Sequence, residues 1–267
     1  MTKQSFTKTA LLALASLAIV ATTAKSQVTY SSAGDFLLGF RQTGTANDIL
    51  VDIGSFNLNS STSISLGDLG TKLAATFGAG WATDASVFFS IAGTGVSGDP
   101  SNTSYVTKVQ YNGDPAPTPW NSLSSGNAIS LKNKIIAEGT AYNTFSQTPG
   151  NPAVVQPTSS TNSYASYMPG GVNDAGHAQG NISYGFFNPT TEGTFSQGTG
   201  NVQLDVYRIL SGSTAAATEV GYFTLSSDGS TLTYTPLAVP EPSTFALIGV
   251  AGIAGVFIRR RQFKSLI

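Results

Sequence analysis

Between residues 27 and 236, short runs of alternating apolar and polar residues are separated by clusters of Gly, Ser, Thr, Asn and Pro. Alternation with a period of two is typical of β-strands, and the clusters are typical of turns. The runs at 36–41 and 49–53 flank a turn at 44–48 and predict an opening hairpin. Further strands are predicted at 87–91, 105–111, 182–187 and 202–210.

Two helices are predicted within this pattern. Four apolar residues recur at three- and four-residue steps over 66–77, and Gly78 follows them, which favours a short helix that ends there. A weaker pattern predicts a second helix over 129–138. The stretch 139–181 contains four prolines among many small polar residues, so we expect a long loop or a linker between two sub-sheets.

The last hairpin of this region is predicted at 221–236, where Asp228 and Gly229 separate two alternating runs. An Asp-Gly pair favours a type I′ turn, in which both central residues have positive φ. Counted outward from that turn, Leu225 faces Leu232 and Phe223 faces Tyr234. All four side chains then lie on one face, which we expect to pack into the core.

The two ends of the chain differ from this pattern. Residues 1–26 resemble a secretory signal peptide, with a basic start, an apolar stretch at 10–21 and small residues before Gln27. Cleavage is predicted between Ser26 and Gln27; cleavage after Ala24 and an uncleaved membrane helix are the alternatives.

At the other end, the uncharged segment 243–258 follows Pro240 and Pro242. A helix of 16 residues is about 24 Å long, slightly short of a membrane core of ~30 Å. The basic residues Arg259, Arg260 and Arg261 then favour a cytoplasmic end. We therefore predict a transmembrane helix over 243–258 with a basic tail; an ordinary membrane anchor and a buried core helix are the alternatives.

The fold class predicted from these elements is all-β. It is a β-sandwich-like body with one or two short helices, flanked by an N-terminal signal helix and a C-terminal transmembrane helix. The predicted organisation is a signal peptide at 1–26, a β-rich extracytoplasmic body at 27–236 with a long loop at about 139–181, and a sorting region at 237–267. A body of about 210 residues accommodates one large all-β domain or two small ones.

The order of a Pro-Glu-Pro segment, an apolar span and an arginine cluster resembles the PEP-CTERM sorting signal of Gram-negative bacteria. The matching sorting residues are Val239, Pro240, Glu241, Pro242 and Ser243, followed by the apolar span to Ile258 and Arg259, Arg260 and Arg261. The resemblance implies the secretion translocon and the inner membrane as transient partners. It also implies processing by the transpeptidase exosortase with loss of the tail, and a final location at the cell surface or in an extracellular polysaccharide matrix.

Parts of the body are also similar to a recurring kind of PEP-CTERM protein. The similar parts are residues 34–41, Phe77-Gly78 before Trp81, and residues 221–225 before Asp228-Gly229. This resemblance implies no activity.

Charge and composition exclude some functions. The region 27–239 contains six Lys and Arg against 13 Asp and Glu, a formal charge of about −7, which argues against a nucleic-acid partner. The chain has no cysteine and one histidine, His177, so neither a disulfide framework nor a histidine-based zinc site is expected, and no cofactor or metal is predicted.

Few residues suggest catalysis. His177 lies in a Gly-rich stretch without a nucleophile motif, so we expect a solvated loop histidine. Asp48 with Asp52, and Glu192 with Asp205, are candidate carboxylate pairs for glycoside hydrolysis, although a solvated surface is the simpler interpretation. Among the aromatic residues that stack on sugar rings elsewhere, Trp81 is expected in the core, whereas Trp120 is the candidate for glycan stacking; Tyr164 and Tyr167 are further candidates.

The sequence thus favours a non-enzymatic surface or matrix protein with a structural, adhesive or glycan-associated role and with extracellular polysaccharide as a candidate partner. The alternative is a secreted glycan-active hydrolase.

Overall fold

The computed structural model describes residues 29–119, 123–145, 151–161, 163–168, 191–212 and 216–237. The strands are β1 (Phe36–Gln42), β2 (Asn47–Gly54), β3 (Thr62–Ser65), β4 (Val87–Thr94), β5 (Ser104–Tyr111), β6 (Ala153–Pro157), β7 (Gly193–Thr194), β8 (Val202–Ile209), β9 (Thr218–Leu225) and β10 (Thr231–Pro236). The helices are α1 (Leu69–Phe77), α2 (Ser125–Tyr142) and α3 (Tyr164–Tyr167), with 3₁₀ turns η1 (Trp81–Thr83) and η2 (Thr199–Asn201).

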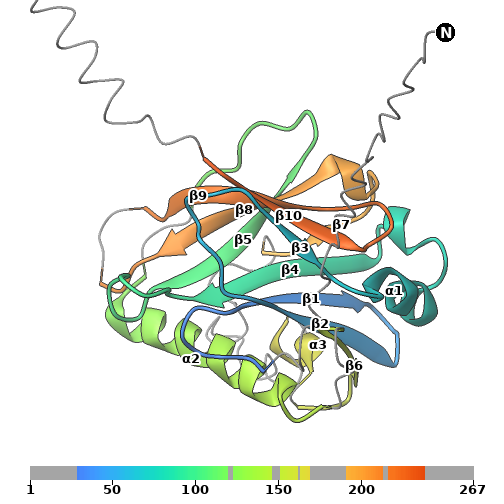
Figure 1. Cartoon of the computed structure of the whole chain (residues 1–267), viewed down its shortest axis with the longest axis horizontal. Coiled ribbons are helices and arrows are strands. Elements are labelled where there is room, and N and C mark those ends of the chain that lie inside the picture. Colours follow the sequence, from blue (N-terminus) through green and yellow to red (C-terminus); the bar gives the residue numbers. More distant parts are fainter. Residues whose placement is uncertain are drawn as a thin grey trace, which may run out of the picture.

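The described strands form one antiparallel sheet, in the order β3-β10-β9-β8-β5-β4-β1-β2-β6, with β7 paired to β4 (Figure 1). The body is therefore mostly β, as predicted. The predicted sandwich-like arrangement of two packed sheets needs correction, because these strands belong to a single sheet that curls into a half-barrel.

Aromatic contacts show how strongly the sheet curls. Three strands lie between β1 and β9, so in a flat sheet these two would be about 19 Å apart at a spacing of about 4.8 Å. The ring of Phe36 on β1 nevertheless lies 6.3 Å from the ring of Phe223 on β9. Phe56 fills the space between them, at 4.9 Å from Phe36 and 5.5 Å from Phe223. The inner face of the half-barrel is thus closed over its own core.

Both faces of the sheet are buried. On β1 and β2, Leu38 and Val51 belong to the inner core, whereas Leu37 and Leu50 belong to a second, outer core. Helices α2 and α3 contact the outer face and cover it (Figure 1). The predicted opening hairpin is confirmed, since β1 pairs with β2.

The two predicted helices are present. Helix α1 buries Leu69, Leu73 and Phe77, and Gly78 ends it with φ of 95°. Helix α2 is longer than the predicted 129–138, because Ser124 accepts a hydrogen bond from the Asn127 N–H at 3.3 Å and so caps an earlier start.

The predicted loop at 139–181 is partly wrong. Among its described residues, α2 continues to Tyr142, β6 pairs with β2, and α3 forms a short turn of helix. The sequence did not predict β6, because prolines ordinarily indicate a loop. Pro157 is nevertheless compatible with this strand, since β6 lies at the edge of the sheet, where a missing N–H donor is tolerated. The strand predicted at 182–187 lies outside the described residues.

The last hairpin has the predicted register. Phe223 pairs with Tyr234 and Leu225 pairs with Leu232, and all four side chains are buried in the inner core. The alternation of apolar residues was therefore sufficient to set the register.

The predicted type I′ turn is wrong. The Gly229 N–H donates to the Ser226 carbonyl at 3.0 Å, so Ser227 and Asp228 are the central residues. Gly229 has φ of 72°, whereas Asp228 has no positive φ. A four-residue loop built on such a turn keeps the same strand register. Asp228 Oδ1 stabilises it by accepting the Ser230 N–H at 3.0 Å.

Helix α1 packs directly on this turn. A Cβ built on Gly70 would lie 1.8 Å from the Asp228 carbonyl oxygen, and a Cβ on Gly229 would lie 3.2 Å from the Trp81 ring. The turn, the helix start and the tryptophan therefore form one close contact between residues distant in sequence.

We expect Gly70→Ala to destabilise the chain by about 1–3 kcal/mol, because the backbone of the turn must move away from the added methyl group. The control is Gly126→Ala in α2, where a Cβ meets nothing within 4 Å. This change should be neutral or stabilising by about 0.5–1 kcal/mol. Urea unfolding of the full-length variants measures both, and equal effects would contradict the packing.

Candidate functional site

The residues that the sequence assigns to sorting and glycan stacking lie outside the described residues. They are Ser26, Gln27, Trp120, Val239, Pro240, Glu241, Pro242, Ser243, Arg259, Arg260 and Arg261. His177 and the predicted span 243–258 also lie outside them. No helix within the described ranges is long and apolar enough to cross a membrane.

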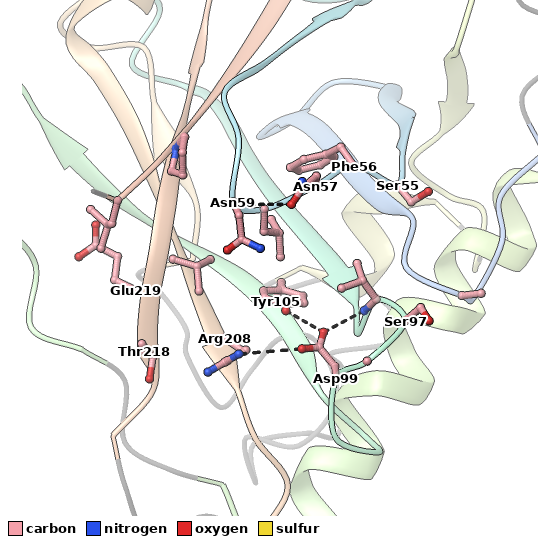
Figure 2. Close-up of a pocket in the computed structure, with 17 residues that line it drawn as sticks. Ser55, Phe56, Asn57, Asn59, Ser97, Asp99, Tyr105, Arg208, Thr218 and Glu219 are labelled. Atoms are coloured by element: carbon pink, nitrogen blue, oxygen red, sulfur yellow. Dashed lines mark hydrogen bonds and ion pairs between the residues drawn. The ribbon is translucent and has the colours of Figure 1, made fainter. Parts of the chain in front are cut away.

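A large groove opens at one end of the half-barrel. We call it the mouth groove. It has a volume of about 1130 Å³ and is formed by the β2–β3 loop, the β4–β5 loop and the adjacent ends of β5, β8, β9 and β10 (Figure 2). The residues that line it include Phe56, Asn57, Asn59, Asp99, Tyr105 and Arg208. Mouths of β-barrels are common places for ligand sites.

Asp99 organises the polar side of the mouth groove. Its Oδ2 accepts the Val96 N–H at 2.9 Å and the Tyr105 hydroxyl at 2.7 Å. Burial, and next the hydrogen bond to Asp99, raise the pKa of Tyr105, so this hydroxyl remains a proton donor. The other oxygen, Oδ1, lies 4.0 Å from Nη1 of Arg208 (Figure 2).

Arg208 has unused hydrogen-bonding capacity. Its Nε is buried and has no acceptor, and no N–H group of its side chain donates to a residue that the structure describes. At 4.0 Å, its contact with Asp99 is an ion pair and is too long for a direct hydrogen bond. The side chain is 37% exposed, so the guanidinium is accessible from the groove.

A β-bulge turns a second carboxylate of the groove, Glu219, away from Asp99. The register between β8 and β9 shifts between Val206 and Tyr207, and this shift leaves Val220 as the extra residue. Glu219 therefore pairs with Tyr207, whose side chain belongs to the outer core. Figure 2 shows the Glu219 side chain pointing away from Asp99. Burial and the nearby Asp205 raise the pKa of Glu219.

The second polar cluster is buried below α3. Arg41 binds Glu192 with two hydrogen bonds, one of them from Nε to Oε1 at 2.8 Å. The Tyr164 hydroxyl donates to the same Oε1 at 3.1 Å and lies 2.7 Å from Ser90 Oγ. The Arg41 guanidinium also lies 4.7 Å from the centre of the Phe88 ring. This two-bond ion pair holds the segment before β7 against the sheet and gives Arg41 a structural role.

The candidate carboxylate pairs are buried, which corrects the expectation of a solvated surface. Asp48 Oδ2 accepts the Ala165 N–H at 2.5 Å, and Asp52 Oδ1 accepts the Gly54 N–H at 2.8 Å. Asp205 accepts from Gln203 at 2.6 Å, and Glu192 is bound to Arg41. These carboxylates make structural hydrogen bonds and do not line the mouth groove.

The aromatic candidates are mostly core residues. Trp81 is buried, as expected, and its ring packs edge-on against Phe195 at 5.4 Å. Tyr164 and Tyr167 are buried too, so sugar stacking by these two residues is a wrong prediction.

Sequence reasoning missed the mouth groove. Asp99 and Arg208 are more than 100 residues apart, and each looks ordinary in its local context. The sequence does show that Arg208 is one of two arginines in the body and stands at the end of a predicted strand. A rare arginine at the end of a strand was therefore the one local feature that could have indicated a binding site there.

Comparisons with known proteins bear on the tail. Residues 238–261 match the family model of the PEP-CTERM protein-sorting motif. No curated protein sequence and no solved structure matches the chain. The motif implies a class of exported proteins that pass through a membrane and are sorted by exosortase. The chain is a PEP-CTERM domain-containing protein, as the sequence predicted.

The buried Asp48 should make stability depend on pH. Burial raises its pKa from 3.8 to about 7, against the lowering effects of the Ala165 N–H, Ser163 and Arg41. Between these two values the folded chain keeps a proton that the unfolded chain loses. The free energy of unfolding should therefore fall as pH rises through this range, by up to about 1.4 kcal/mol per pH unit.

We expect Asp48→Asn to remove this contribution, so that the variant loses less stability than the unmodified chain as pH rises from 3.8 to about 7. The matched control is Asp114→Asn, at an exposed turn residue. Urea unfolding at several pH values measures the difference. Parallel pH profiles for Asp48→Asn and the unmodified chain would contradict the assignment.

Proposed function

We propose that this protein is displayed at the cell surface or in the extracellular polysaccharide matrix of a Gram-negative bacterium, in a non-enzymatic structural, adhesive or glycan-associated role. The signal peptide at 1–26 directs it to the translocon. The span 243–258 holds it in the inner membrane until exosortase removes the tail.

The position of the sorting motif carries this proposal. The motif begins at residue 238, directly after Leu237, the last described residue of the body. Processing within 240–242 therefore releases the whole described sheet, and it leaves only a few residues beyond β10. A sorting signal placed there favours delivery of the intact half-barrel to the cell exterior.

The polar residues of the body favour a non-enzymatic role over a glycan hydrolase. Hydrolysis of glycosidic bonds ordinarily needs two carboxyl groups that flank the scissile bond, about 5–9.5 Å apart. In the mouth groove, Asp99 faces Arg208, and the bulge at Val220 turns the Glu219 carboxylate away. The two carboxylates that line the described groove, Asp99 and Glu219, thus do not face each other across one bond, as that reaction needs.

We expect the mature protein to begin at Gln27 and to end within 240–242, because the two terminal signals are removed on opposite sides of the body. Intact mass of the product released by the cells measures both ends. A variant with Ala at Pro240, Glu241 and Pro242 should keep its tail and remain in the membrane fraction. Released protein that still contains Arg259, Arg260 and Arg261 would exclude tail removal.

We further expect the released product to liberate no reducing sugar from polysaccharides, and His177→Ala to change nothing in that assay. The physical reason is that Glu219 points away from Asp99, so the two carboxylates of the groove do not form a facing pair. Sugar release that disappears in Asp99→Asn or His177→Ala, with an unchanged melting curve, would instead support the hydrolase.

A further inference from the structure

We infer that the mouth groove binds a neutral glycan chain, with Asp99 and Arg208 sharing one sugar hydroxyl between them. This inference rests on the proposed surface or matrix role and names the ligand class for it.

Asp99 and Arg208 both have unused hydrogen-bonding capacity. The Arg208 side chain donates no hydrogen bond to a described residue, and its Nε is buried without an acceptor. Asp99 uses Oδ2 for Val96 and Tyr105, while Oδ1 accepts no hydrogen bond from the described residues. Arg41, by contrast, donates two hydrogen bonds to Glu192. The exposed N–H groups of the Arg208 guanidinium and Oδ1 of Asp99 are therefore available to a ligand or a water molecule in the groove.

The distance between Asp99 and Arg208 leaves room for one more atom. Asp99 Oδ1 and Arg208 Nη1 are 4.0 Å apart. An oxygen placed about 2.8 Å from both fits this gap. That oxygen must donate to the carboxylate and accept from the guanidinium, and a hydroxyl does both. A carboxylate group has no proton for Asp99, and both carboxylate and phosphate groups are repelled by its charge. The gap therefore fits a hydroxyl, which is the repeating polar group of a sugar.

The charged residues of the mouth groove favour an uncharged ligand. The charged residues that line the groove are Asp99, Glu219 and Arg208, one cation against two carboxylates. The lining includes no lysine among the described residues. A uronic-acid or sulfated polymer would meet this negative balance at every repeat, whereas an uncharged glycan would not. The groove thus favours a neutral chain.

The surface beside the ion pair combines an aromatic ring, Phe56, with the side-chain amide of Asn57. Phe56 is partly exposed at the groove and is fixed from beneath by Phe36 at 4.9 Å and Tyr234 at 5.1 Å. Next to it, Asn57 Oδ1 accepts the Asn59 N–H at 2.9 Å, which leaves the Asn57 amide hydrogens free to donate (Figure 2). A rigid aromatic ring with adjacent amides suits a sugar ring, which has an apolar face and polar edges. A volume of about 1130 Å³ admits several such rings.

The test is a binding titration of the full-length chain, purified in a detergent without a sugar headgroup. The probes are oligosaccharides from neutral glucans, mannans, galactans and xylans, with oligogalacturonate as the anionic comparison. Calorimetry measures affinity, and saturation-transfer NMR identifies the bound rings. We expect at least one neutral oligosaccharide to bind and oligogalacturonate to bind more weakly.

Asp99→Asn and Arg208→Gln should each weaken this binding about tenfold or more, because each removes one half of the hydroxyl site. Asp114→Asn, at an exposed turn away from the groove, should leave affinity unchanged. Thermal melts confirm folding. If Arg208→Gln fails to fold, Arg208→Lys replaces it, because lysine keeps the charge but lacks the planar donor fork.

Three results would overturn the inference: no neutral probe binds the folded chain, both variants bind like the unmodified protein, or oligogalacturonate binds more tightly than every neutral probe. None of these results affects the mass of the released product. Conversely, retention of the tail would reject the proposed sorting and would leave the binding result intact.

Discussion

The contact between the Phe36 ring on β1 and the Phe223 ring on β9 requires a curled sheet, and the rest of the structure depends on that curl. Curling lets a single sheet bury its own inner face, so a second sheet is not needed to cover it. The outer face then needs a different cover, which α2 and α3 provide. The mouth groove is the open end of the same curl.

The two arginines of the body show how position decides the role of a charge. Arg41 is held by Glu192 and by the Phe88 ring, and its 15% exposed side chain stabilises the sheet. Arg208 stands at the open end of β8 and meets one carboxylate at a distance that leaves room for another atom. The bulge at Val220 contributes to this difference, because it turns Glu219 outward and prevents a second, closer partner for Arg208.

Local patterns predicted much of the fold and little of the site. The alternation of apolar residues set the register of β9 and β10 correctly, although the type of turn between them was wrong. Strand β6 was not predicted, because a proline-rich composition does not distinguish an edge strand from a loop. The single sheet was not predictable either, since curling depends on contacts between distant strands. The pairing of Asp99 with Arg208 depends on the same curl, so no local pattern contains it.

The groove and the sorting signal are also linked in space. Leu237 lines the mouth groove, and the sorting motif begins at the next residue. The six residue-to-residue steps from Leu237 to Ser243 span at most about 21 Å, whatever the conformation. In the membrane-anchored precursor that we propose, the groove therefore lies close to the bilayer, where a long glycan has restricted access. Removal of the tail relaxes this constraint. On the two proposals together, sorting and glycan binding occur in sequence, since release from the membrane is the step that opens the groove to a polymer.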